Sequence, residues 1–307
     1  MQINKRAVSH TIKNTDEKVF CIVAHVLLAL LGLICIGAFL LVLGSSFQTE
    51  QEIQQYGYSI LPRKFSTEAY IAVFNNSKTI VNAYIVTIVT TVIGTCIGVI
   101  SSAGAGYVIS RPNYRYRKIL SFYIFFTMLF NGGLVPSYIL ITQWLHLKNT
   151  IWAQILPLIT NAWYILLMKG FFRGLPDSIT EAARIDGASE LGVFTAIILP
   201  ISKPVLATIA LFYALGYWND WYQSLLYIDD PSLYKLQYLL MQILRKVQFM
   251  NSEMGQATAN ISSGAMQMPT LNLRMAMCVL AVGPMLVVFP FFQKYFVRGI
   301  TVGAIKG

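Results

Sequence analysis

The chain has 307 residues, of which 56% are hydrophobic and only 12% are charged, and its mean hydropathy is +0.59. Soluble domains carry about 25% charged residues, so this composition excludes an ordinary soluble protein and predicts a membrane protein. The formal net charge of +10 would also suit nucleic acid. Most basic residues, however, lie in short segments between apolar runs, where anionic lipid accounts for them, and no nucleic-acid binding is expected.

Six apolar runs are long enough to cross a hydrocarbon core of about 30 Å. The predicted fold class is therefore an all-α membrane protein with six transmembrane helices, preceded by a terminal segment of residues 1–18. The fourth span is short and carries Gln154, Thr160 and Asn161 among its apolar residues. The spans expected within residues 19–307 are about 19–43, 80–108, 119–142, 151–168, 205–228 and 272–292.

The distribution of basic residues predicts the orientation of these spans. With the N-terminus in the cytoplasm, fifteen of the 23 Lys and Arg residues lie in inner segments and seven in outer segments, and Arg274 lies at the lip of the last span. An excess of positive charge marks the cytoplasmic side. Both termini are therefore expected in the cytoplasm. The first apolar run, of about 25 residues, is too long for a cleaved signal.

Residues 45–79 connect the first two spans and are rich in aromatic and aliphatic side chains, which indicates interfacial helices at the bilayer surface. The second span has small residues at intervals of four, a pattern that predicts close packing against another helix. Those residues are Gly94, Gly98, Ser102 and Gly106.

The third span is interrupted by Asn131, Gly132, Gly133 and Pro136. Glycine and proline weaken the helical hydrogen-bond ladder, so a bend is expected just beyond the midplane. Irregular backbone at this depth must face protein or water. Asn131 could therefore line a cavity, and a helix-to-helix hydrogen bond explains it equally well.

No catalytic or metal site is expected. The cysteines lie in or beside apolar runs without paired spacing, and three histidines are scattered over separate segments. The chain has no nucleophile, base and orienting group that would support a membrane enzyme. It also lacks the GxxxxGK[ST] phosphate loop, so any ATP and Mg²⁺ must be bound by another subunit.

The loop from 169 to 204 has the signals of two short capped helices. Ser178 and Glu181 are spaced as a capping box, and Gly187 stands where a left-handed stop is needed. Ser189 can cap the second helix and Pro200 can close it. The loop also carries apolar residues that cannot form a core of their own. They must be buried against this chain's own helices or against a partner, and the sequence leaves both open.

The sequence of this loop resembles that of a known family. Glu181, Ala182 and Ala183 are followed after three residues by Gly187, after nine more by Ile197, and then by Leu199 and Pro200. This spacing in EAARIDGASELGVFTAIILP resembles the EAA loop of the permease subunits of binding-protein-dependent ABC importers. FNGGLVPSYIL, LFYALGYWNDW and FFQKYFVRGITVGAIKG are similar to the carbohydrate-uptake branch of that family.

The resemblance implies a type I ABC importer permease fold in a bacterial cytoplasmic membrane. It implies four kinds of partner: membrane lipid, a homologous second permease, two cytosolic ATPase subunits that bind ATP and Mg²⁺, and an extracytoplasmic sugar-binding protein. The EAA loop is expected to form coupling helices in a cleft of the ATPase, with Gly187 at the turn and Ala182 and Ala183 allowing close approach. The coupling residues implied are Glu181, Ala182, Ala183, Arg184, Asp186, Gly187, Ile197, Leu199 and Pro200.

Asp220 is a carboxylate in the fifth span, where it costs about 2.5–3.5 kcal/mol at mid-bilayer, so it should face a wet cavity or a partner. Its neighbours Trp218, Asn219, Trp221 and Tyr222 offer aromatic faces and hydrogen-bonding groups that suit a sugar. An interfacial aromatic belt explains them equally well.

The function expected from these features is ATP-driven import of a carbohydrate, with an oligosaccharide as the expected substrate and no chemistry on it. Two alternatives are an ion-coupled secondary transporter and a membrane enzyme acting on lipid-linked sugar. The spacing from Glu181 to Pro200 argues against both.

Overall fold

The computed structural model describes residues 15–75, 77–250 and 271–304, and within these ranges every regular element is a helix. The chain divides into two compact units, residues 1–71 with 268–279 and residues 72–267 with 280–307. The last helix, α16 (Leu271–Ala304), contributes to both units. The predicted all-α architecture is confirmed for the described residues.

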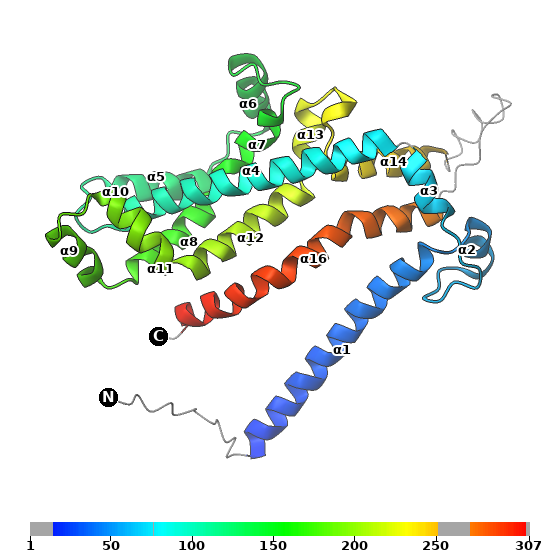
Figure 1. Cartoon of the computed structure of the whole chain (residues 1–307), viewed down its shortest axis with the longest axis horizontal. Helices are drawn as coiled ribbons and strands as arrows, with labels where there is room; N and C mark the ends of the chain where they lie inside the picture. The colour runs from blue at the N-terminus through cyan, green and yellow to red at the C-terminus, as the bar shows by residue number, and fades with distance from the viewer. Residues whose placement is uncertain (1–14, 76, 251–270, 305–307) are drawn as a thin grey trace. The chain divides into compact units, whose positions relative to one another are not determined.

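The first unit is dominated by α1 (Thr15–Ser45), the long blue helix of Figure 1. Within it, Lys18–Ser45 has a mean hydropathy of 3.1 over its most apolar window, and none of that window is buried in the structure. A helix that is apolar on all sides and uncovered by protein is typical of a membrane span. The length and composition of α1 therefore fit the first predicted span.

The segment after α1 is held by buried polar side chains. Thr49 caps α2 (Glu50–Tyr56), with its Oγ1 accepting the N–H of Glu52 at 3.3 Å. The carboxylate of Glu52, only 7% exposed, accepts the backbone N–H groups of Arg63 at 2.7 Å and Lys64 at 3.3 Å. The loop between α2 and α3 (Glu68–Asn75) is thereby ordered. Helices do occur in the stretch predicted to be interfacial, and their depth in a bilayer stays a prediction.

The Glu52 contacts predict a pH dependence. The backbone N–H of Arg63 is the largest influence on the carboxyl group, and it lowers the pKa of Glu52. A lowered pKa in the folded state means that the stabilisation is present at neutral pH and is lost as the pH falls through the folded-state pKa. The protection factors of the Arg63 and Lys64 amides, which correct for intrinsic exchange, should fall as the pH drops below the ordinary glutamate pKa of 4.5 and through the lowered folded-state pKa.

Glu52→Gln is expected to remove this pH dependence, because glutamine does not titrate. Glu68→Gln, at an exposed glutamate of α3, is the matched control and should leave the exchange profile of the wild type. Protection factors at Arg63 and Lys64 that do not change with pH in the wild-type protein would contradict the assignment.

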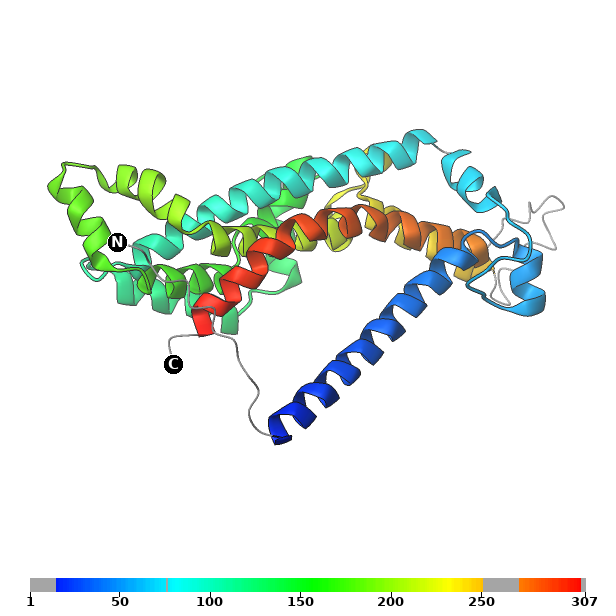
Figure 2. The same ribbon diagram turned by 60° about the horizontal axis from the view of Figure 1, so that its bottom comes forward.

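The second unit is built around α4 (Ser77–Ser110), the cyan helix of Figures 1 and 2. Three other helices pack along it: α7 (Ile151–Ile159), α8 (Ala162–Arg173) and α12 (Lys203–Asn219). Their shared core includes the buried side chains of Tyr107, Met168, Tyr213 and Tyr217.

The stripe of small residues on α4 is a packing surface, as predicted. A Cβ atom added at Gly94 would overlap the ring of Tyr217, and one added at Gly98 would lie 2.8 Å from the ring of Tyr213. At Gly106, an added Cβ would lie 2.7 Å from the Cβ of Met168 on α8. Glycine is therefore needed at these positions for α8 and α12 to approach α4.

The predicted spans agree with the structure to different degrees. Lys18–Ser45, Lys78–Ser110 and Leu271–Pro290 are each long and apolar enough to cross a membrane, and three bent helix pairs would bring the number to six. In the third predicted span, α5 (Arg117–Leu129) is followed after a break by α6 (Leu134–Ile139) and the π-helix η1 (Leu140–Trp144). The break was predicted, but the bend of 111° is large, so residues 134–144 do not continue the direction of α5.

The fourth predicted span is bent by 48° between α7 and α8. Of the three polar residues in this span, Gln154 lies inside α7 and Thr160 and Asn161 lie at the bend. Asn161 accepts the N–H groups of Trp163 at 3.0 Å and Tyr164 at 3.4 Å. The asparagine side chain thus restarts the helix as an N-cap. The fifth predicted span is also divided, since α12 ends at Asn219 and α13 (Tyr222–Tyr227) follows a break at Asp220. After α13 come the short 3₁₀ turn η3 (Pro231–Leu233) and α14 (Leu236–Met250).

Candidate functional site

Residues 177–201 form two helices joined by a tight turn, which we call the two-helix segment. The first is α9 (Asp177–Ile185). The second begins with α10 (Glu190–Gly192) and continues without interruption through η2 (Val193–Ile198) and α11 (Leu199–Ile201). This second helix lies at 83° to α12. If α12 crosses the membrane, the second helix therefore runs nearly parallel to the membrane plane.

The turn between the two helices depends on Gly187, whose φ is +81°. The N–H of Gly187 donates to the carbonyl of Arg184 and that of Ala188 to the carbonyl of Ala183, both at 3.0 Å. These two bonds define a Schellman motif, which places a glycine in the left-handed region just beyond the helix. The predicted left-handed stop is confirmed.

The predicted caps are only partly correct. Ser189 caps the second helix, its Oγ accepting the N–H of Gly192 at 3.1 Å. The capping box at Ser178 is wrong, because α9 begins at Asp177 and Pro176 occupies the N-cap position. Pro200 does not close the second helix, which continues to Ile201. Pro200 thus lies inside a continuous helix, just after the widened turns of η2.

One side of the two-helix segment is buried in the core of its own unit. Ala183, Val193 and Ile198 are 8%, 0% and 0% exposed and belong to the same cluster as the α4 residue Tyr107. The ring of Tyr107 lies 4.9 Å from that of Phe194 between centroids. The side chain of Ala183 therefore faces the interior of its own unit, and its role in coupling stays a prediction. Ile197 and Leu199 pack against the same core and are half-buried.

The other side of the segment is uncovered. Ile185 is 86% exposed and Leu191 72% exposed, one on each helix. Arg184 bridges the helices between them, with Nε and Nη2 both 2.7 Å from Oε1 of Glu190. The hydrogen bond to Glu190 raises the pKa of Arg184 above its usual value. The exposed members of the predicted coupling set are Glu181, Ala182, Arg184, Asp186, Gly187 and Pro200.

Glu181 also lines a polar pocket of about 160 Å³ between the end of α4 and α9. Arg111 and Arg184 contribute positive charge to this pocket, and Asp177 and Glu181 contribute negative charge. Arg111 Nη1 lies 3.4 Å from Thr180 Oγ1 and its guanidinium lies over the Tyr107 ring at 4.3 Å. The end of α4 is thereby joined directly to α9.

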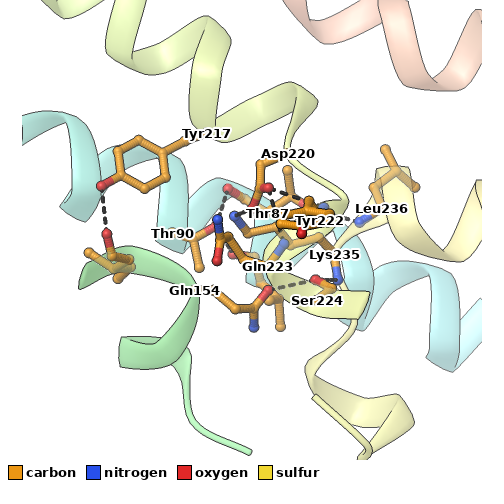
Figure 3. A network of polar contacts seen from close by, with 12 residues as sticks. Thr87, Thr90, Gln154, Tyr217, Asp220, Tyr222, Gln223, Ser224, Lys235 and Leu236 are labelled. Atoms are coloured by element: carbon orange, nitrogen blue, oxygen red, sulfur yellow. Dashed lines mark hydrogen bonds and ion pairs between the residues drawn. The ribbon is translucent and has the colours of Figure 1, made fainter. Parts of the chain in front are cut away.

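The predicted substrate path lies at the opposite end of α4, around Asp220 (Figure 3). Asp220 Oδ2 lies 2.7 Å from Lys235 Nζ, and these side chains are only 7% and 0% exposed. The carboxylate therefore has a protein partner and does not face an open cavity. We call this cluster, with Thr87, Gln154 and Ser224, the polar network.

The other residues of the predicted path divide into buried and exposed groups. Trp218 is 5% exposed and its Nε1 donates to the carbonyl of Ala281 at 2.9 Å, so it packs against α16 in this structure, and its place in the substrate path stays a prediction. Trp221 and Tyr222 are 37% and 41% exposed, and Asn219 is exposed beside them with its Nδ2 bonded to the carbonyl of Leu215.

Asn131 is exposed at the break after α5, and its place in the substrate path stays a prediction. Its Oδ1 accepts the N–H of Gly133 at 2.9 Å and so stabilises the break after α5 locally. The residue that sequence reasoning missed is Lys235. A carboxylate in an apolar segment calls for a counter-ion, and a lysine fifteen residues further along, beyond the turn at Pro231, was the available signal.

Comparison with known proteins identifies the family of this chain. Residues 94–302, which include the two-helix segment and the polar network's Gln154, Asp220, Ser224 and Lys235, match the family described as binding-protein-dependent transport system inner membrane component. The chain belongs to this family.

Two relatives and one solved structure are similar to this permease over almost their whole length. Protein LplC of Bacillus subtilis (strain 168) is 38% identical over 97% of this chain and 99% of its own. The polygalacturonan/rhamnogalacturonan transport system permease protein YtcP of the same organism is 36% identical over 95% of this chain and 99% of its own. A bacterial ABC transporter involved in the import of the acidic polysaccharide alginate matches with a TM-score of 0.76 and 29% identity, covering 92% of this chain and 98% of that one.

Membership of this permease family confirms the resemblance read from Glu181 to Pro200. The high coverage of the relatives shows that the resemblance extends well beyond that motif. The alginate transporter supports an ABC importer permease fold for this chain.

Proposed function

We propose that this chain is the permease subunit of an ATP-driven importer for a carbohydrate, with an oligosaccharide as substrate. Its partners would be a homologous second permease, two cytosolic ATPase subunits that bind ATP and Mg²⁺, and an extracytoplasmic sugar-binding protein. Six spans would place both termini and the two-helix segment in the cytoplasm. The chain itself would carry out no chemistry on the sugar.

The observation that carries this proposal is the uncovered apolar surface of the two-helix segment. Ile185 and Leu191 project from two helices whose relative angle is set by Gly187 and by the Arg184–Glu190 pair. A buried inner side and an exposed apolar outer side together suit docking into a groove of another protein. We assign the ATPase as the occupant because this is the role of the matching loop in the family.

The same segment shares a core with α4 and α12, so its movement would move the membrane-spanning helices. Tyr107 and Arg111 join the end of α4 to η2 and α9. Closure of two ATPase subunits would draw two such segments together, and rigid helices packed on them would rock as bodies. This motion would exchange an inward-facing cavity for an outward-facing one.

Two features support a sugar as the substrate. YtcP is named for transport of polygalacturonan and rhamnogalacturonan, and the alginate transporter for an acidic polysaccharide. Trp221 and Tyr222 present half-exposed aromatic rings beside the exposed amide of Asn219. Sugar rings stack on aromatic faces and require hydrogen-bonding groups for their hydroxyls.

Reconstitution tests the whole proposal. The complex in proteoliposomes is expected to hydrolyse ATP faster when sugar-loaded binding protein is added, and to accumulate labelled oligosaccharide only with ATP. An ionophore that collapses ion gradients should leave uptake unchanged. Uptake without ATP that the ionophore abolishes would establish a secondary transporter, and chemical conversion of a lipid-linked sugar by the chain alone would establish an enzyme.

The two adjacent alanines separate docking from folding. Ala182→Leu adds volume to an exposed position and is expected to weaken co-purification of the ATPase while leaving the thermal stability of the permease unchanged. Ala183→Leu adds the same volume to a buried position and should lower the free energy of unfolding by about 1–3 kcal/mol. Equal effects of both variants on thermal stability would contradict the orientation of α9.

A further inference from the structure

The buried pair of Asp220 and Lys235 is not used by the proposed transport cycle. Its charged atoms are 2.7 Å apart, and the two side chains are 7% and 0% exposed. Removing two charges from water is costly, and apolar residues of similar volume often stabilise a protein as well as such a pair. Stability alone therefore does not explain these residues, whereas a requirement for defined geometry does.

The pair fixes the break between α12 and α13. Oδ1 of Asp220 accepts the N–H groups of Tyr222 and Gln223, both at 3.2 Å, which satisfies donors at the start of α13. Oδ2 of the same carboxylate binds Lys235, which immediately precedes α14. A single side chain therefore sets where α13 begins and where α14 begins.

The intervening residues, 221–234, are attached at further points. Ser224 Oγ donates to Gln154 Oε1 at 2.8 Å and accepts the N–H of Lys235 at 3.3 Å. Gln154 Nε2 donates to the carbonyl of Leu233 at 3.0 Å. The N–H of Leu236 donates to Thr87 Oγ1 on α4 at 2.9 Å. Figure 3 shows these contacts converging on Asp220 and Lys235.

The residues that follow Asp220 are the exposed aromatic pair. The rings of Trp221 and Tyr222 lie 5.8 Å apart between centroids and at 88° to each other. Both side chains begin within two residues of the break, so the backbone conformation at Asp220 determines where the rings point. If the backbone at Asp220 were not held in one conformation, both rings could turn away from a bound ligand.

We propose that Lys235 is a positioning residue that, through Asp220, holds Trp221 and Tyr222 in the orientation in which the permease presents them to its sugar. The inference rests on the proposed function, because contact between these rings and the sugar is part of it. Lys235 has no exposed surface and does not touch the substrate itself. A positioning defect should reduce the amount of sugar transported per ATP hydrolysed, whereas a defect in assembly reduces both rates together.

The test uses the reconstituted complex with its binding protein and three variants of this chain. Trp221→Ala removes a ring that would contact the sugar. The double variant Asp220→Asn with Lys235→Met removes both charges, leaves no unpaired one, and keeps an Oδ1 acceptor for α13. Lys148→Met is the matched control, since it breaks the exposed pair of Lys148 and Asp229, whose charged atoms are also 2.7 Å apart. Asp229 lies in the same segment, residues 221–234.

We expect Trp221→Ala and the double variant each to lower the sugar transported per ATP by about tenfold, with receptor-stimulated hydrolysis retained. Lys148→Met should retain the wild-type ratio. If Trp221→Ala lowers the ratio and the double variant does not, the positioning role is overturned and the sugar path stands. If Trp221→Ala retains the wild-type ratio, sugar contact by this ring is wrong and the positioning role falls with it.

Asp220→Asn alone provides a second measurement should the double variant fail to assemble. When its Oδ1 keeps the cap on α13, the new amide nitrogen cannot accept from Lys235, so the bond to Lys235 is lost. A reduced ratio of transport to hydrolysis in this assembled variant supports the inference, and a wild-type ratio overturns it.

Discussion

Gly187→Pro is expected to abolish the coupling of ATP hydrolysis to the loaded binding protein. The φ of Gly187 is +81°, whereas proline is fixed near −65°. Proline also removes the N–H that donates to the carbonyl of Arg184. The turn cannot form with this residue, so Ile185 and Leu191 would no longer be held on one surface. The local cost should be about 3 kcal/mol or more.

The measurement is receptor-stimulated ATP hydrolysis, with co-purification of the ATPase recorded in parallel. Two further variants at this position grade the effect. Gly187→Asn should retain most of the coupling because asparagine tolerates the left-handed region. Gly187→Ala should show coupling between that of the asparagine variant and that of the proline variant, at a cost of about 1–2 kcal/mol. Gly170→Ala, at an exposed helical glycine with open space around it, is the control. ATP hydrolysis stimulated to the wild-type level in the proline variant would contradict the docking role of this turn.

Gly94→Ala is expected to destabilise the membrane core. The added Cβ would overlap the ring of Tyr217, which is only 1% exposed. That ring cannot withdraw easily, because its hydroxyl donates to the carbonyl of Ile155 at 2.8 Å. Either α12 must move away from α4 or the tyrosine must lose this bond. Overpacking of this kind costs about 1–3 kcal/mol.

Thermal unfolding of the detergent-solubilised complex measures this effect. Gly104→Ala is the matched control, because it lies on the same helix and a Cβ there meets nothing within 4 Å. The control should melt at the wild-type temperature or slightly above it. If both alanine variants melt alike, α4 and α12 do not approach each other as described.

Local features of the structure could be predicted from sequence because they depend on a few neighbouring residues. Gly187 adopts the left-handed conformation since no side chain opposes it, and Ser189 caps a helix that begins beside it. The break after α5 follows from consecutive glycines near Asn131. The composition of the apolar runs likewise predicted a helical membrane protein. None of these inferences required knowledge of a distant residue.

Other features of the site depended on residues far apart in the chain. The sequence marks Asp220 as a carboxylate in need of a partner, and the tertiary structure supplies Lys235, which lies beyond α13 and directly before α14. Ala182 and Ala183 are the same residue type, and only the packing of α9 onto η2 and the shared core buries one and exposes the other. The sequence by itself thus determined the class of the protein, the turn at Gly187 and the break after α5, since hydrophobicity and φ preference are local. The tertiary structure decided which polar groups are paired and which faces remain free, because burial depends on helices that meet only after folding.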